Sequence, residues 1–455
     1  MVNKFFLRGL GFFNDAYDLS VINIVNVILK HQYGSAYSTD MKSNVSTAAL
    51  IGAVLGQLVF GFLGDMYGRK NCMIATCAIL IIGGILTAAA YGGSASGTLW
   101  FLVIARGILG FGIGGEYPLA ASSSSEDATN PADRNRRVAL TFSLQGVGFF
   151  VAGAMGLIMV NVLDENTKNL EIMWRVLFGV GVLPALFLVY YRITAEETHV
   201  YKNMLADEVH MKKVRWSFII RHYWKSLLGT AGTWFLFDIV FYAQNLFTAS
   251  ILTVVGAKST LRTTALQNVI ISLVALPGYY VACLFINRMG RKRIMIQGAT
   301  VMTIVFLILG IWWSDIKQSS AAFIVLFGLT LFFANFGPNM STFVMPTEMY
   351  PTAIRSSCHG FSAASGKAGA SIGSYGFSLW VDNPNFGYKG TWFTFAGISL
   401  LTIILTIFFM FDNNDEASVM DEDFKAKLAG EGEDVRKSFA SELGAPLDHY
   451  VENKA

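Results

Sequence analysis

Charged residues are scarce in this chain: they make up only 14% of its 455 residues, and the net charge is only +3. The mean hydropathy is +0.49, which lies outside the range of soluble globular domains. The four Cys lack metal-ligand or redox spacing, and the six His are scattered, with no nucleophile–base arrangement. The sequence therefore predicts no catalytic residue, no metal site, no cofactor and no enzyme. Nucleic acid is not an expected partner.

Long apolar runs are abundant instead, and they predict an all-α membrane protein that contacts the lipid bilayer. A spanning helix needs about 20 mostly apolar residues. Polar breaks divide the sequence into twelve such runs. The runs begin near Phe5, Val45, Met73, Leu99, Val138, Trp174, Ser226, Thr263, Ile294, Ala321, Ser356 and Thr391.

One polar turn occurs twice, 222 positions apart. Residues 65–70 read DMYGRK and residues 287–292 read NRMGRK, and each stretch joins two apolar runs. Self-similarity at this distance indicates an internal duplication, which is the architecture of a secondary transporter. The expected organisation is a six-helix half over 1–194, a cytoplasmic central loop over 195–225, a second half over 226–411 and a cytoplasmic tail over 412–455.

The basic residues of the short loops cluster on one side of the predicted membrane. Loops that follow an even number of helices carry most of the Lys and Arg, whereas the opposite loops hold scattered single charges. By the positive-inside rule, both termini are expected to be cytoplasmic. The turn from Gly61 to Lys70 resembles that of the major facilitator superfamily. Because Asp65, Arg69 and Lys70 lie outside the hydrocarbon region, we expect them to hold a gate rather than to bind substrate.

Ionisable residues inside the apolar runs are the strongest functional signal. Each costs about 2.5–3.5 kcal/mol at the centre of a helix, so each is a functional candidate. Asp15 and Asp18 are three positions apart, share a helix face and can line one path. Asp238 follows Asp15 by 223 positions, nearly the spacing of the repeated turns. Trp234, Asp238 and Tyr242 recur every fourth residue and form one stripe along a helix.

Polar residues also interrupt later helices. Glu116 and Tyr117 follow a Gly-rich stretch that lets helix backbones approach closely. Asn339 follows Pro338, whose break in the helix is tolerated at membrane depth only beside protein or a cavity. Lys367 lies among small residues, where its charge must line a cavity or pair with a carboxylate.

Several of these residues have a structural alternative. Asp15 or Asp18 could be a helix-packing partner for Arg8 or Arg106, and Gln145 could hydrogen-bond a neighbouring helix. Lys367 could belong to an isolated structural ion pair. His359, near the start of the eleventh helix, is expected to be interfacial packing rather than a proton relay.

Six motifs in order carry a family resemblance: GFFNDAYD, GIGGEYPL followed by SSE, SLQG, WFLFDIVFY, NFGPN and GKAGA. Together they resemble the proton-coupled phosphate symporters of fungi and plants, which have twelve helices in two pseudo-symmetric halves. The resemblance covers nearly the whole chain except the central loop and the tail. It implies a multi-pass plasma-membrane protein that imports inorganic phosphate with protons by alternating access. It indicates no oligomeric state.

The resemblance also implies roles for individual residues. Family members bind phosphate at the midplane, and the matching positions are Tyr117, Gln145, Trp234, Asp238, Tyr242, Asn339 and Lys367. The residues expected to couple transport to protons are four carboxylates, Asp15, Asp18, Glu116 and Asp238. Since phosphate beside Asp238 would meet a like charge, we expect Asp238 to bind it as the protonated acid.

One departure from the family leaves the substrate open. The family usually has Asp before the Tyr-Pro of the fourth helix, but this chain has Glu116, which moves the carboxylate by about 1.5 Å. The glycerophosphodiester permeases often carry Glu there, and their seventh helix also resembles WFLFD. Proton symport of glycerophosphocholine or glycerophosphoinositol is therefore one alternative, and a phosphate-sensing transceptor is another. A sugar-type facilitator without coupling would hardly need so many buried charges.

Overall fold

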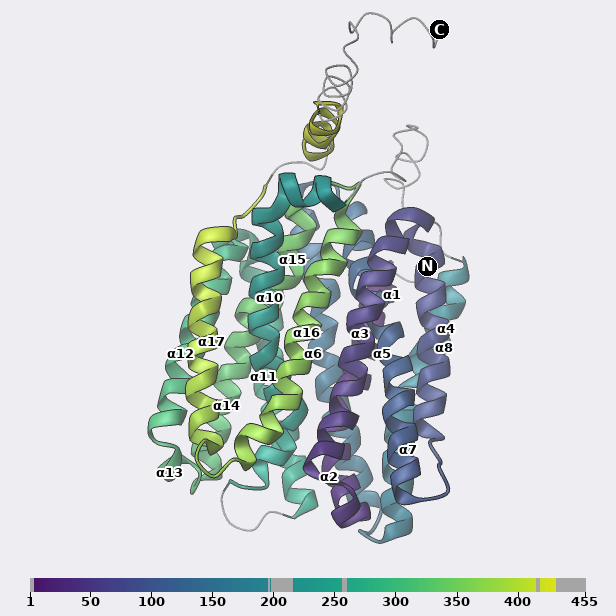
Figure 1. The fold of residues 1–455 in the computed structure, drawn as a ribbon, viewed down its shortest axis with the longest axis vertical. Helices are drawn as coiled ribbons and strands as arrows, with labels where there is room; N and C mark the ends of the chain where they lie inside the picture. Colours follow the sequence, from purple (N-terminus) through teal and green to yellow (C-terminus); the bar gives the residue numbers. More distant parts are fainter. Residues whose placement is uncertain (1–3, 195–196, 198–215, 256–259, 415–417, 431–455) are drawn as a thin grey trace, which may run out of the picture.

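The computed structural model describes residues 4–194, 197, 216–255, 260–414 and 418–430, and the regular structure among them is helical. Within this part of the chain the helices make twelve passes along one bundle, as the sequence predicts. The passes begin with α1 (Lys4–Ser20) and end with α17 (Gly387–Phe409) (Figure 1). We call the end of the bundle where α1 begins and α17 stops the terminal end, and the opposite end the far end.

The first six passes contain every polar residue that the sequence flags in the first half. They are formed by α1 with α2 (Ile22–Tyr33), α3 (Thr39–Tyr67), α4 (Arg69–Ala88), α5 (Ala95–Glu126), α6 (Pro131–Val162), and α7 (Thr167–Val180) with α8 (Val182–Thr194). A short helix, η1 (Gly34–Ala36), follows α2.

The second six passes follow the same order. They are α10 (Trp216–Leu252), α11 (Leu261–Met289), α12 (Arg291–Ile311), α14 (Ser320–Ala334) with η3 (Asn335–Asn339) and α15 (Met340–Met349), α16 (Arg355–Asp382) and α17. The single turn α13 (Trp313–Ile316) lies at the far end, and residues 418–430 form a helix of the tail. The predicted break at Pro338 is present, because Phe336 and Gly337 have non-helical dihedral angles.

Helix α10 begins at Trp216, earlier than the start near Ser226 that hydropathy predicts. Its first turns are amphipathic: Phe218 and Ile219 are buried against Phe424 of the tail helix, whereas their neighbours are exposed. A hydropathy reading of the apolar run misses such a segment. Of the predicted central loop over 195–225, residues 195–196 and 198–215 lie outside those that the structure describes.

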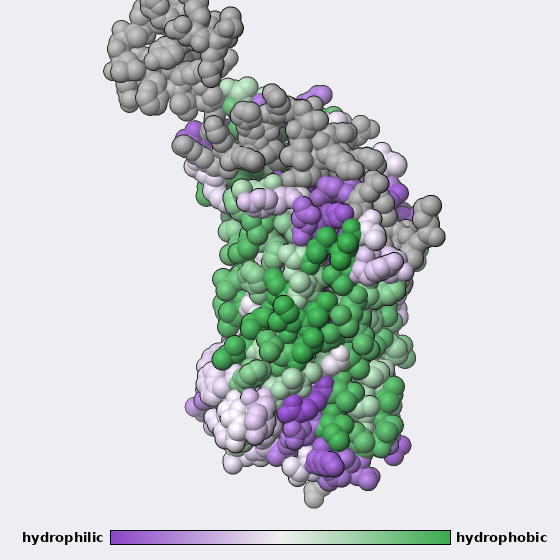
Figure 2. Space-filling view, turned by 90° about the vertical axis from the view of Figure 1, so that its right-hand side faces the viewer, coloured by the Kyte–Doolittle hydropathy of each residue, from purple (hydrophilic) through white to green (hydrophobic). Residues whose placement is uncertain are grey.

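Among the described residues, ten helices are long and apolar enough to cross a membrane. An apolar belt covers the middle of the face shown in Figure 2, with polar residues gathered towards both ends. The two passes that miss this description are the first, which is divided near Val21, and α16. These two passes carry Asp15, Asp18 and Lys367, so the polar residues that weaken the membrane signal are the functional candidates.

Two observations support the predicted duplication. Gly68 and Gly290, in the two repeated turns, have φ of 90° and 86°, a conformation that residues with a Cβ rarely adopt. Between the halves, α3 packs along α16 and α6 packs along α11. The predicted substrate-binding residues lie on α5, α6, α10, η3 and α16, and the predicted proton-coupling residues Asp15 and Asp18 lie on α1.

Candidate functional site

An ion pair from the second half lies at the centre of the bundle. Lys367 Nζ on α16 is 3.1 Å from Asp238 Oδ2 on α10, and both residues are buried. The ammonium also lies 4.6 Å from the ring centre of Tyr117 on α5 and 4.4 Å from that of Tyr242. Aromatic faces attract cations at such distances. Lys367 is therefore not in an isolated pair, because it also contacts Tyr117 of the first half.

Uncharged hydrogen-bonding groups from both halves surround this ion pair. The Gln145 amide on α6 donates to the Tyr117 hydroxyl at 3.0 Å and accepts from the Tyr279 hydroxyl at 2.9 Å. Asn339 of η3 donates to Tyr279 at 2.9 Å, and the hydroxyls of Tyr117 and Tyr242 are 3.4 Å apart. All five side chains are buried. We call these five residues, with Trp234, Asp238 and Lys367, the central cluster.

Tyr279 on α11 is a member of the central cluster that the sequence reading missed. It lies in an apolar run, and a Tyr there is usually packing. The available signal was its position just after Pro277 and Gly278, a break inside a predicted membrane helix. In the structure its hydroxyl links Gln145 of the first half to Asn339 of the second.

Trp234 and His359 form an aromatic side of the central cluster. Trp234 lies one turn before Asp238 on α10, and its ring is 5.5 Å from His359 and 6.4 Å from Phe343, edge to face. His359 is fully buried, so the expectation of an interfacial position is wrong, although the residue does pack. Its Nε2 lies 3.2 Å from the Phe343 carbonyl oxygen.

A second group of charges is buried within the first half. Arg192 of α8 donates through both Nη1 and Nη2 to the Glu116 carboxylate, at 2.9 Å for Nη1. The same guanidinium donates to the Met73 carbonyl at 3.0 Å and to Cys77 Sγ at 2.9 Å. Sequence reading missed Arg192 because an Arg at the end of a helix usually marks the membrane surface.

Asp15 lies beside this ion pair without a partner of its own. It is fully buried, and neither carboxylate oxygen has a hydrogen-bond partner among the described residues. The charges that act on it come from Glu116, Asp18, Arg192 and Lys367. An unpaired buried carboxylate is costly, so packing alone does not account for Asp15.

Asp18 has a different environment one turn further along. It accepts a hydrogen bond from Asn14 at 3.1 Å, and Gly181, at the break between α7 and α8, packs against its carboxylate. Arg106 acts on it electrostatically. Arg106 itself donates to the Val45 carbonyl at 3.0 Å. The structural alternative, packing beside Arg106, therefore has some basis for Asp18, whereas Arg192 is the nearby Arg that acts on Asp15.

The predicted gate residues lie at the terminal end. Arg69 donates to Glu126 at 2.7 Å and lies 3.1 Å from Asp65. Asp65 accepts from the Ser357 backbone N–H at 2.8 Å and from the Ser357 hydroxyl at 2.6 Å. The first turn of α16, in the other half, is therefore bound to α3. The Lys70 backbone N–H donates to Glu197 at 3.0 Å.

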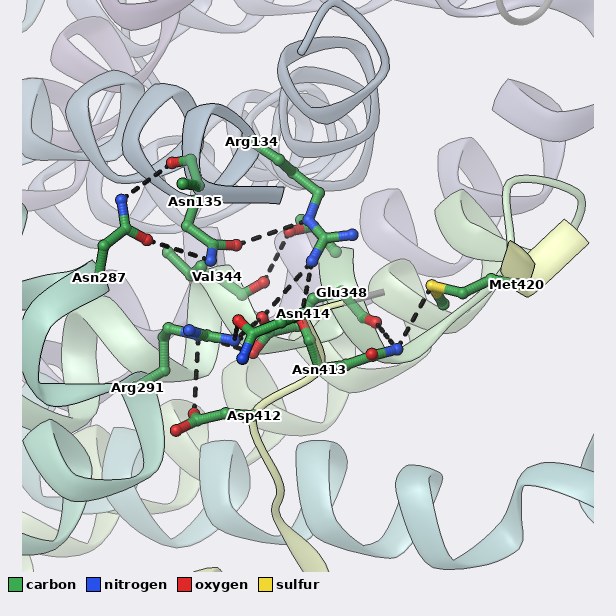
Figure 3. Close-up of polar contacts among 12 residues, drawn as sticks. Arg134, Asn135, Asn287, Arg291, Val344, Glu348, Asp412, Asn413, Asn414 and Met420 are labelled. Atoms are coloured by element: carbon green, nitrogen blue, oxygen red, sulfur yellow. Dashed lines mark hydrogen bonds and ion pairs between the residues drawn. The ribbon is translucent and has the colours of Figure 1, made fainter. Parts of the chain in front are cut away.

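The second repeated turn has a matching cluster that the sequence reading did not assign (Figure 3). Arg291 donates to both carboxylate oxygens of Glu348. Arg134, from the first half, lies 3.7 Å from Glu348. Asn135 donates to Asn287 at 3.3 Å. The halves are thus bound together at both turns.

The opposite side of the central cluster is bridged as well. Asn23 on α2 donates to Asn268 on α11 at 2.8 Å and accepts from the Ala249 backbone N–H at 2.8 Å. Closer to the far end, Thr39 donates to Asp382 at 2.9 Å. Contacts between the halves therefore lie on both sides of the central cluster. Among the described residues, no group of His, Cys, Asp and Glu could hold a metal ion.

Comparisons with known proteins all find transporters. Residues 7–415 match the family model described as sugar (and other) transporter. The chain is 36% identical to the probable inorganic phosphate transporter 1-6 of Arabidopsis thaliana, over 88% of this chain and 89% of that protein. It is 35% identical to the low affinity inorganic phosphate transporter 3 of Petunia hybrida, over 82% and 80%.

Solved structures share the fold at low sequence identity. The major facilitator superfamily proton:xylose symporter XylE has a TM-score of 0.76 and is 16% identical, over 91% of this chain and 98% of that one. A partially occluded inward-open structure of XylE from E. coli gives a TM-score of 0.72 at 16% identity, over 90% and 98%. At this level of identity the likeness concerns the fold alone.

Proposed function

The chain belongs to the sugar (and other) transporter family of the major facilitator superfamily, and we propose that it imports inorganic phosphate together with protons. It is a transporter, not an enzyme, and an integral multi-pass membrane protein. The observation that carries the proposal is the Lys367–Asp238 pair among neutral donors of both halves. Such a site can bind an anion, because the anion can replace Asp238 as the charge partner of Lys367.

The ion pair supplies a way to couple phosphate to protons. Without substrate, Asp238 balances the Lys367 charge across 3.1 Å. An arriving phosphate competes for Lys367, which leaves Asp238 beside a second negative charge. Protonation of Asp238 removes that repulsion, and the neutral acid can then donate a hydrogen bond to phosphate. Proton and phosphate therefore bind interdependently.

The same exchange explains release. When the site opens to the cytoplasm, Asp238 loses its proton and returns to Lys367, which weakens the hold on phosphate. The hydroxyls and amides of Tyr117, Gln145 and Tyr242 bind the anion without the charge of an Arg clamp. The remaining members of the binding set are Trp234 and Asn339, and Tyr279 joins them through its hydrogen bonds to Gln145 and Asn339.

The proton route is proposed to run through the carboxylates of the first half. Asp15 is the strongest candidate, because it is buried and has no hydrogen-bond partner among the described residues. Glu116, which is paired with Arg192, influences electrostatically whether Asp15 holds a proton. Asp18 extends the route along α1. Lys367 acts on Asp15 electrostatically, so a change of charge in the central cluster affects the proton route, and the reverse.

Alternating access then follows from the contacts between the halves. Because the basic loops lie at the terminal end, we place that end in the cytoplasm and the far end outside. The plasma membrane is the location that the family resemblance implies. The proposed units remain a first half over 1–194, a cytoplasmic central loop over 195–225, a second half over 226–411 and a cytoplasmic tail over 412–455, with residues 216–225 of the loop forming the first turns of α10. The inner gate contains Asp65 and Arg69, with Lys70 adjoining.

Glu116 bears on the alternative substrate. Its longer side chain is engaged by both Nη atoms of Arg192, so it has a role that does not depend on the size of the pocket. Glu116 therefore gives no reason to prefer a glycerophosphodiester, and the phosphate transporters among the relatives favour inorganic phosphate.

Uptake into proteoliposomes tests the proposal. Labelled phosphate should accumulate only with an inward proton gradient, and unlabelled phosphate should compete more strongly than glycerophosphocholine at equal concentration. Stronger competition by glycerophosphocholine would identify a glycerophosphodiester transporter. Phosphate binding without proton-dependent uptake would identify a sensor.

A further inference from the structure

A cavity of about 410 Å³ opens between the halves at the far end, away from the central cluster. It lies where α2 ends and α3 begins in one half, and where α10 and α16 end in the other. Both halves supply polar side chains to its wall. The chemically important ones are Lys30, His31, Lys42, Thr253, Asp382 and Tyr388. We call this cavity the vestibule.

Two ammonium groups of the vestibule have no carboxylate partner. Lys30 Nζ donates to the carbonyls of Gly34 and Tyr37, at 3.1 and 3.2 Å, so it is fixed in place but not neutralised. Lys42 Nζ lies 5.1 Å from the ring centre of Phe247. In the described part of the chain it makes no hydrogen bond or ion pair. Both charges can therefore attract an anion, and Asp382 acts on that of Lys42 electrostatically without forming an ion pair.

The one carboxylate of the vestibule is engaged elsewhere. Asp382 accepts a hydrogen bond from Thr39 at 2.9 Å, across the boundary between the halves. It forms no ion pair with either lysine among the described residues. Counting His31 as neutral, the vestibule has two positive charges and one negative charge. An excess of positive charge in a concave site raises the local concentration of anions.

We propose that the vestibule is a second phosphate site, which captures the anion from outside before it passes to the central cluster. This inference rests on the proposed function and orientation. Lys42 and Lys30 attract phosphate as point charges, and the hydroxyls of Thr253 and Tyr388 can hydrogen-bond to it. Asp382 keeps the site weak, so that the anion can leave inwards once the contacts of Asn23 open.

The test is the concentration dependence of labelled phosphate uptake into proteoliposomes under a fixed proton gradient. Lys42→Gln should raise KM about threefold to tenfold with little change in Vmax, because capture is lost but the central cluster is intact. Lys30→Gln should act in the same direction. Lys42→Arg keeps the charge and should restore the KM. The increase in KM should shrink as ionic strength rises, because salt screens the attraction.

Two further variants test whether removal of the negative charge lowers KM. Asp382→Asn should lower KM about twofold to threefold, since its amide oxygen still accepts from Thr39 while the negative charge is gone. Thr39→Val removes the same hydrogen bond but keeps the charge, so it should not lower KM. Lys168→Gln is the matched control, an exposed lysine at the far end that does not line the vestibule.

Three results would overturn the inference. One is an unchanged KM in both Lys42→Gln and Lys30→Gln while the wild type takes up phosphate. Another is a fall in Vmax that accounts for the whole effect. A third is an equal effect of Lys168→Gln, which would reduce the role to general surface charge. A wild type that takes up no phosphate would instead overturn the proposed function itself.

Discussion

Each half has a buried carboxylate in its first helix, and the two carboxylates have different surroundings. Asp238 of the second half has a cation, Lys367, at 3.1 Å. Asp15 of the first half, 223 positions earlier, has no hydrogen-bond partner among the described residues. A carboxylate with a cation can exchange that partner for an anion, whereas one without a partner can only gain or lose a proton. We therefore propose that substrate exchange takes place at Asp238 of the second half and proton transfer at Asp15 of the first half.

The repeated turns show the same kind of divergence. Arg69 with Glu126, and Arg291 with Glu348, form equivalent pairs 57 positions apart. The contacts between halves are not equivalent. In the first turn, a charged Asp65 binds the N-terminus of α16. In the second turn, a neutral Asn287 takes the place of Asp65.

The tail adds a further difference at the second turn. Asp412 accepts from the Lys292 backbone N–H at 2.9 Å. The Asn413 carbonyl accepts from Arg134 at 2.9 Å and from Arg291 at 3.3 Å. One peptide group thus contacts an Arg from each half (Figure 3). The duplicated scaffold keeps the ion pair within each half and varies the contacts across the boundary, where movement occurs.

The largest expected effect is that of Asp238→Asn, which removes the exchangeable charge. The amide can still hydrogen-bond to phosphate, but it cannot take up a proton, so accumulation against a gradient should fall to none. Equilibrium binding of phosphate should remain measurable. The measurement is the steady-state ratio of internal to external phosphate under an inward proton gradient. Uphill accumulation at the wild-type level would exclude Asp238 from coupling.

Asp15→Asn tests the other side of the comparison. If Asp15 transfers protons, the rate of proton-driven uptake should fall about tenfold or more, while phosphate binding changes much less. Asp18→Asn should act in the same direction with a smaller effect, because Asp18 has a hydrogen bond from Asn14. Loss of phosphate binding with intact proton-driven exchange would contradict the assignment of both residues.

The sequence predicts the fold better than it predicts the pairing of charges. Apolar runs and their polar breaks locate all twelve passes, because the membrane imposes a length and a composition on most of them, although the first pass and α16 fall short of that description. The repeated turns locate the halves. The position of Asp238 and Lys367 inside apolar runs also identifies them as candidates, but it does not predict which charged side chains form ion pairs. The Arg192–Glu116 pair depends on the packing of α8 against the first half, and no local pattern encodes such a contact.

Asp65→Asn makes the first turn chemically similar to the second. A charged acceptor at a helix N-terminus stabilises the contact by about 1 kcal/mol, so its loss should raise the population open at the terminal end about fivefold. Ser356→Cys is a suitable reporter in a background without the native cysteines, since Ser356 is buried against Gly64 of α3. Its alkylation rate should rise accordingly. Asn287→Ala, which removes only neutral hydrogen bonds, should raise the alkylation rate less. A larger increase than that of Asp65→Asn would show that the second turn, not the first, is the stronger contact between the halves.

The smallest effect should come from Glu116→Asp, which shortens the carboxylate that departs from the family pattern. Arg192 can follow the shorter side chain in part, so the buried charges stay balanced and phosphate uptake should remain within about threefold of the wild type. Glu116→Gln is the matched control. It leaves the Arg192 guanidinium buried without a counter-charge, which costs about 3–5 kcal/mol, so it should lower both folding yield and uptake far more. Competition by glycerophosphocholine should be the same in Glu116→Asp and the wild type, because Glu116 contacts Arg192 rather than the central cluster. A change in which substrates compete would instead give Glu116 a part in selecting the substrate and would favour the glycerophosphodiester alternative.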